Sequence, residues 1–124
     1  MSDATILIAD DEAGIRLMVL RMLSGEYTVL EAADGEEAVE LTRLHKPSLV
    51  LMDIMMPRKD GYSACHEIKT DLQTKSTPVL MVSAIGHKLN EKLSAEMGAD
   101  GYITKPFSLE RLLEAIGQYV PRPI

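Results

Sequence analysis

The sequence predicts an α/β domain built as a doubly wound, five-stranded parallel sheet of order (βα)5 with helices on both faces. Five short apolar runs alternate with segments of helical spacing, which implies right-handed crossovers between parallel strands. The runs ILIA (6–9) and LVLM (49–52) lack polar alternation, which is typical of strands buried on both sides. With 124 residues, 46% of them hydrophobic, the chain is expected to form one domain over residues 1–124.

The strands are predicted where apolar runs of strand length are bounded by polar or turn-forming residues. They are expected at residues 5–9, 27–32, 48–52, 78–83 and 101–104. Beyond the last helical segment, residues 121–124 (PRPI) are expected to form a C-terminal tail or the start of a linker.

Five helices are predicted between and after these strands. Asp34 opens the second, with Glu37 at the spacing of a capping box, and this helix ends before Pro47. The third begins at residues 60–61 and the fourth stops at Gly98. The first and the last carry apolar stripes at i, i+3, i+4 and i+7, formed by Ile15, Met18, Val19 and Met22 and by Leu109, Leu112, Leu113 and Ile116, with Ser108 as the cap of the last.

Composition excludes several classes of protein. The formal net charge of -6 argues against direct nucleic-acid binding through a broad basic face. The single cysteine, Cys65, cannot form an internal disulfide, and no apolar segment approaches the ~20 residues that cross a bilayer. The N-terminal residues also lack the features of a secretory signal, so a cytoplasmic protein without a membrane partner is expected.

Polar residues collect where the predicted strands end. Asp10 and Asp11 follow the first strand, Asp53 the third, Ser83 ends the fourth, and Lys105 follows the fifth. The carboxyl ends of parallel strands share one edge, and two like charges ~4 Å apart repel by roughly 4 kcal/mol at an effective dielectric near 20. The three carboxylates therefore need cations, and oxygen ligands without supporting His or Cys favour Mg²⁺. Such a set is typical of phosphoryl transfer, with Asp53 as the candidate nucleophile.

Four motifs in this order resemble the receiver domain of bacterial two-component response regulators. They are ILIADDE (6–12), LVLMDIMMPRKDGY (49–62), PVLMVSA (78–84) and GADGYITKPF (98–107), and the resemblance extends from Thr5 to about Val120. It implies the flavodoxin-like strand order 2-1-3-4-5. It also implies a phosphorylation-activated signalling switch, not an enzyme acting on other substrates, whose partner is a sensor histidine kinase or a phosphotransfer protein.

The resemblance also assigns roles within the site. Asp53 would accept the phosphoryl group, Lys105 would pair with the phosphoryl oxygens, and Ser83 would donate its hydroxyl to one of them. The Lys105–Pro106 peptide bond would be cis. The implied Mg²⁺ ligands are Asp10, Asp11 (the more direct of the two), Asp53 and the backbone carbonyl of Met55.

In receivers the hydroxyl residue moves toward the phosphoryl group and an aromatic residue on the fifth strand turns inward. Those positions are Ser83 and Tyr102, although Tyr102 could also be an ordinary half-buried strand residue. The output face would then be the fourth helix, fifth strand and fifth helix, acting on a downstream protein or an output domain, and the same face could serve a homodimer. The resemblance implies that the positions of Met55 and Ile85 are among those that often tune hydrolysis of the acyl phosphate in this family. Neither side chain can orient an attacking water, so slow self-dephosphorylation is expected.

Three other functions compete with this interpretation. A haloacid-dehalogenase-like phosphatase would need a second acid two residues after the nucleophile, where this chain has Met55. A flavodoxin-like cofactor binder would need a phosphate-cradling loop after the first strand, where ADDEAG (9–14) places negative charge. A constitutive protein-interaction module with a vestigial acidic site remains as the alternative function.

Overall fold

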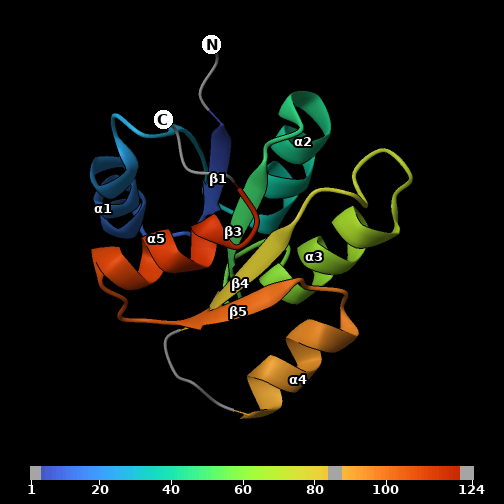
Figure 1. The fold of residues 1–124 in the computed structure, drawn as a ribbon. Coiled ribbons are helices and arrows are strands. Elements are labelled where there is room, and N and C mark those ends of the chain that lie inside the picture. Colours follow the sequence, from blue (N-terminus) through green and yellow to red (C-terminus); the bar gives the residue numbers. More distant parts are fainter. Residues whose placement is uncertain (1–3, 84–87, 121–124) are drawn as a thin grey trace.

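The computed structural model describes residues 4–83 and 88–120, so Ile85 and the expected tail at 121–124 lie outside the described residues. Strands and helices alternate along the chain in the predicted order (Figure 1). The elements are β1 (Thr5–Ala9), α1 (Ala13–Leu23), β2 (Thr28–Ala32), α2 (Gly35–His45), β3 (Leu49–Asp53), α3 (Gly61–Thr70), β4 (Val79–Ser83), α4 (Lys88–Glu96), β5 (Gly101–Thr104) and α5 (Leu109–Gly117).

The five strands form one parallel sheet in the order β2-β1-β3-β4-β5, which confirms the predicted topology. Helices α1 and α5 cover one face, and α2, α3 and α4 lie on the other side (Figure 1). None of the described helices has both the length and the apolar character needed to cross a membrane.

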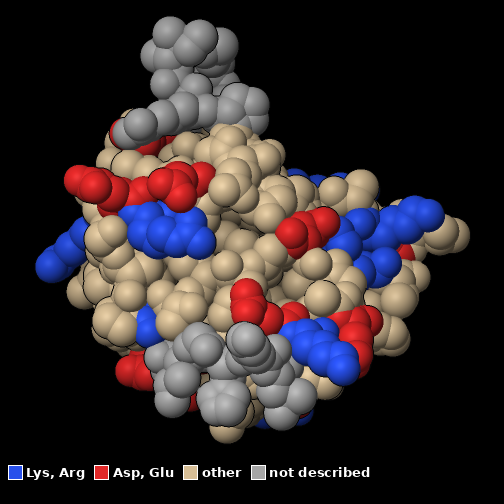
Figure 2. All heavy atoms as spheres, turned by 60° about the horizontal axis from the view of Figure 1, so that its bottom comes forward, with Lys and Arg blue, Asp and Glu red and all other residues tan. Residues whose placement is uncertain are grey.

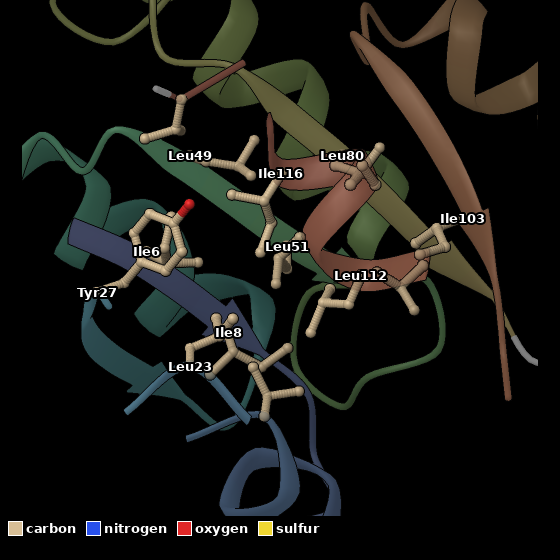
Figure 3. Close-up of a cluster of buried hydrophobic side chains, with 14 residues drawn as sticks. Ile6, Ile8, Leu23, Tyr27, Leu49, Leu51, Leu80, Ile103, Leu112 and Ile116 are labelled. Atoms are coloured by element: carbon tan, nitrogen blue, oxygen red, sulfur yellow. The ribbon is translucent and has the colours of Figure 1, made fainter. Parts of the chain in front are cut away.

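The core consists of two apolar layers because side chains alternate between the two faces of each strand. Ile6 and Ile8 point toward α1 and α5, where they pack with Leu112 and Ile116 (Figure 3). The other layer contains Leu7 and Ala9 of the same strand and apolar residues of α2 and α3. All five residues of β3 are buried, as its uninterrupted apolar sequence predicts.

Three helices begin with a side-chain cap, and the caps at Asp34 and Ser108 are those that the sequence predicts. Asp34 accepts a hydrogen bond from the Glu37 N–H (2.8 Å), and the Glu37 carboxylate reaches back to the N–H of Ala33 (2.7 Å). Asp60 and Ser108 cap α3 and α5 in the same way, each through its side-chain oxygen. These bonds satisfy N–H groups that have no partner inside the helix, which fixes where each helix starts.

Asp100 fixes the start of the edge strand β5. Its carboxylate accepts hydrogen bonds from the Val79 N–H at the start of β4 (2.8 Å) and from Lys69 Nζ at the end of α3 (2.9 Å). Its carbonyl accepts a third from the Tyr119 hydroxyl (2.8 Å). One residue thus joins α3, β4 and the C-terminal end of the described chain where β5 begins.

Candidate functional site

The carboxyl ends of the strands bring three of the predicted site residues into direct contact. Lys105, which follows β5, places its Nζ 2.7 Å from Oδ2 of Asp10 and 3.3 Å from Oδ1 of Asp53. Asp10 follows β1 and is only 1% exposed, while Asp53 ends β3 and is 7% exposed. The lysine therefore joins the two buried carboxylates across the central strands.

The loop after β3 holds Asp53 at this edge by turning back sharply into α3. The Gly61 N–H donates to the Ile54 carbonyl (2.7 Å), and a Cβ at position 61 would overlap the carbonyl oxygen of Asp53. Within the loop, Arg58 has a φ of 66°, and the Lys59 carbonyl accepts a hydrogen bond from the Gly35 N–H (3.0 Å). Only glycine fits the close approach at the start of α3, so the backbone around Asp53 is tightly packed.

The charges of the three groups perturb one another. Burial, followed by repulsion from Asp10, raises the pKa of Asp53 from 3.8 to about 6, although the charge and the hydrogen bond of Lys105 act in the opposite direction. Burial by itself would lower the pKa of Lys105, but its hydrogen bond to Asp10 and the charges of both carboxylates outweigh burial and raise it. Lys105 therefore stays cationic, while Asp53 is an unusually basic carboxylate.

Asp10 already uses both oxygens within the protein. Oδ1 accepts a hydrogen bond from the Glu12 N–H (2.9 Å), and Oδ2 accepts the one from Lys105. The Asp10 carbonyl accepts a hydrogen bond from Arg16 Nη1 (2.7 Å), and Arg16 also pairs with Glu31 of β2 (3.1 Å). Arg16 was not predicted as a site residue, and in the sequence it stands only as a basic residue five positions after Asp11.

Oxygen ligands for a cation lie beside these groups. Asp10, Asp11 and Glu12 each offer a carboxylate oxygen, and these oxygens lie within 4.8 Å of one another. Asp11 and Glu12 are exposed, whereas Asp10 is buried and held by Lys105. A donor set made only of oxygens fits a hard divalent ion such as Mg²⁺, and Asp11 is the exposed member of the predicted ligand pair Asp10 and Asp11.

The other predicted residues occupy the same region or its border. Ser83 ends β4, is buried, and accepts a hydrogen bond from Nδ2 of Asn90 on α4 (3.3 Å). Tyr102 is half-buried on β5 and packs against the apolar layer next to α3. Met55 lies two residues beyond Asp53 with its side chain 78% exposed. The Lys105–Pro106 peptide bond is cis, as the resemblance implies.

Acidic and basic side chains alternate in small groups on the face that Figure 2 shows. This face lies at the lower side of Figure 1, where β5 and α4 lie. Among the described residues drawn there, basic side chains form no broad area of the kind that binds nucleic acid.

The sequence and the fold both have close counterparts among known proteins. Residues 6–117 match the response regulator receiver domain family. The transcriptional regulatory protein PdtaR of Mycobacterium tuberculosis is 43% identical over 119 residues, covering 94% of this chain and 57% of that protein. The chain spans about half the length of the curated relatives it matches.

Two solved structures match almost the whole fold. The chemotaxis protein CheY4 of Vibrio cholerae superimposes with a TM-score of 0.89 at 30% identity, covering 96% of this chain and 100% of that chain. The receiver domain of the sensor histidine kinase PA1611 of Pseudomonas aeruginosa, which has a magnesium ion coordinated in its active site cleft, gives a TM-score of 0.87 at 27% identity over 95% and 98% of the two chains. With the family match covering most of its length, this chain belongs to the receiver domains of response regulators.

Proposed function

We propose that Asp53 accepts a phosphoryl group from a phosphohistidine of a sensor histidine kinase or phosphotransfer protein, in a Mg²⁺-dependent reaction that switches this domain between two states. The observation that carries this proposal is the buried contact of Lys105 with both Asp10 and Asp53. A lysine beside a poorly solvated carboxylate provides a nucleophile together with a cation for the oxygens of an incoming phosphoryl group.

In the transfer step, an oxygen of Asp53 bonds to phosphorus as the phosphorus–nitrogen bond of the phosphohistidine breaks. The bonding electron pair returns to the imidazole ring, and an acyl phosphate forms on Asp53. A carboxyl group with a pKa of about 6 is mostly ionised at neutral pH, and its burial makes it more nucleophilic than a solvated aspartate. Lys105 would then pair with one phosphoryl oxygen, and Ser83 would donate its hydroxyl to another.

Four groups would hold the metal: the side chains of Asp10, Asp11 and Asp53 and the backbone carbonyl of Met55. A bound Mg²⁺ would supply positive charge for the phosphoryl oxygens. Asp11 is exposed and would be the direct ligand, since both oxygens of Asp10 already accept hydrogen bonds. The magnesium ion coordinated in the active site cleft of the PA1611 receiver domain supports the choice of Mg²⁺ as the metal.

Phosphorylation would change the output face formed by α4, β5 and α5, with Ser83 and Tyr102 as the residues that respond first. A phosphoryl group can shift the two states only by interacting differently with each of them. The face would act on a downstream protein or on an output domain, and it could serve a homodimer. In this proposal the chemistry is confined to the domain's own phosphorylation and slow dephosphorylation.

The test is incubation with acetyl phosphate and Mg²⁺ followed by intact-mass measurement. The expected result is a gain of one phosphoryl group that Asp53→Asn abolishes. Asp60→Asn is the matched control, because Asp60 is the exposed cap of α3, where asparagine serves equally well. If no adduct forms under conditions that label another receiver domain, the proposal is wrong and a constitutive interaction module becomes the better interpretation.

A further inference from the structure

A chain of hydrogen bonds runs from α3 through α4 to Ser83. The Tyr62 hydroxyl on α3 donates to Oδ1 of Asn90 on α4 (2.9 Å), and Nδ2 of Asn90 donates to Oγ of Ser83 at the end of β4 (3.3 Å). Tyr62 and Asn90 are half-buried and Ser83 is buried. These bonds therefore lie at the border of the core, where they compete less with water than surface bonds do.

The hydrogen bonds from Tyr62 through Asn90 to Ser83 all run in one direction. A side-chain amide has one accepting and one donating end, and the Tyr62 hydroxyl occupies the accepting end of Asn90. The donating end is consequently turned toward Ser83. A serine hydroxyl has a single hydrogen, and because its oxygen accepts a bond from Asn90, that hydrogen points away from Asn90.

We infer that Tyr62 and Asn90 are positioning residues that keep the Ser83 hydroxyl oriented as a hydrogen-bond donor to an anion bound at Asp53. The inference rests on the proposed function, in which that anion is the phosphoryl group. The Tyr62 hydroxyl donates to Asn90 and Asn90 donates to Ser83, so both of these bonds run toward Ser83. An oxygen that accepts a hydrogen bond becomes a better donor through its own hydrogen. The two residues thereby act on the phosphoryl group through Ser83 without touching it.

The surroundings of Tyr62 keep its hydroxyl protonated, so the hydrogen bonds keep this direction. Burial, with smaller contributions from Tyr102 and Asp60, raises the pKa of Tyr62 above its ordinary value. The phenol therefore remains protonated across the physiological range and continues to donate to Asn90. Since α4 lies against β5, Asn90 also connects Ser83 to a helix of the proposed output face (Figure 1).

The test uses beryllofluoride, which mimics a phosphoryl group on a carboxylate, with Mg²⁺ and a ¹⁹F NMR titration of affinity. Asn90→Ala should weaken binding about fivefold, the effect of losing one hydrogen bond of ordinary net strength. Tyr62→Phe should act in the same direction with a smaller effect, and it retains the ring and its packing. Lys92→Ala, at an exposed position of α4, is the matched control and should bind as the wild type does.

The same substitutions in a Ser83→Ala background separate positioning from general structural damage. If Asn90 acts through Ser83, Asn90→Ala should have no further effect there. Asn90→Asp should weaken binding more than Asn90→Ala when Ser83 is present, because a carboxylate cannot donate and would draw the Ser83 hydrogen to itself. That excess loss should shrink once Ser83 is absent.

The outcomes distinguish this inference from the proposed function. If the wild type binds no beryllofluoride, both fail. If the wild type binds but Asn90→Ala and Tyr62→Phe bind equally well or more tightly, the positioning role alone is refuted. An undiminished effect of Asn90→Ala in the Ser83→Ala background would also refute it, since Asn90 would then act by another route.

Discussion

In metal-free buffer, replacing Asp53 with asparagine should stabilise the protein, and the gain should grow with pH. The pKa of Asp53 rises from 3.8 to about 6 on folding, chiefly through burial and then through repulsion from Asp10. Between these two pH values the folded protein holds a proton that the unfolded chain has released. The stability of the wild type therefore falls as pH rises through this window.

The size of the effect follows from the same shift. A tenfold change in acid dissociation is worth about 1.4 kcal/mol, so the folded wild type loses about 3 kcal/mol by the time the pH passes 6. Asp53 is still 7% exposed, and contact with water reduces the cost of its charge, so about 3 kcal/mol is an upper value for this loss of stability. Asparagine has nearly the same shape but no charge to bury, so Asp53→Asn avoids the loss.

Urea unfolding in EDTA between about pH 4 and pH 7 measures the difference in free energy of unfolding between the two proteins. The difference should be smallest at pH 4 and should level off above pH 6. Adding Mg²⁺ should narrow it, because an ion that binds only the folded wild type stabilises that protein. A difference that is constant across this range, or a wild type that is more stable than Asp53→Asn at pH 7, would refute the reasoning.

Three further substitutions test other parts of the site. Lys105→Ala leaves the buried Asp10 without its cation and should cost about 3 kcal/mol in urea unfolding; a loss below about 1 kcal/mol would show that the pair behaves like a surface ion pair. Gly61→Ala forces a Cβ against the carbonyl of Asp53 and should destabilise the protein by about 2 kcal/mol. It should also slow labelling of Asp53 by acetyl phosphate, and labelling at the wild-type rate would contradict the tight packing around Asp53. Met55→Asn places a group that can orient a water beside the acyl phosphate and should shorten the lifetime of that phosphate. The lifetime is followed by loss of the added phosphoryl mass and should be much longer than seconds in the wild type. A wild-type lifetime of seconds would overturn this prediction.

The fold was readable from the sequence because its determinants are local or periodic. Alternating apolar runs give strands and helices, and Asp34, Asp60 and Ser108 stand where their side chains cap helices. The boundaries were less predictable. Tyr27 was expected within the second strand, but its N–H donates to the Leu23 carbonyl at the end of α1, so β2 starts one residue later.

The contact of Lys105 with Asp10 and Asp53 was also predictable in outline, since parallel strands deliver their carboxyl ends to one edge. The bonds of Arg16 and Asn90 were not predictable. Arg16 reaches the Asp10 carbonyl through a long side chain, and Asn90 bonds to residues of two other elements, Tyr62 of α3 and Ser83 of β4. Neither arrangement produces a periodic pattern in the sequence. Such contacts are set by tertiary packing and require coordinates.

The hydrogen bonds of Asp100, at the start of β5, help to determine where Lys105 lies at the end of the same strand. Strand β5 pairs with β4 alone, and Lys105 follows Asp100 by five positions along an extended backbone. Slipping this pairing by one residue would carry the ammonium group about 3.3 Å along the strand, more than an ion pair tolerates. Asp100 thus fixes the register of β5 and, through it, the position of Lys105. Substitutions of Asp100 should therefore impair the proposed phosphorylation of Asp53, although Asp100 lies at the other end of the strands and contacts none of the site residues.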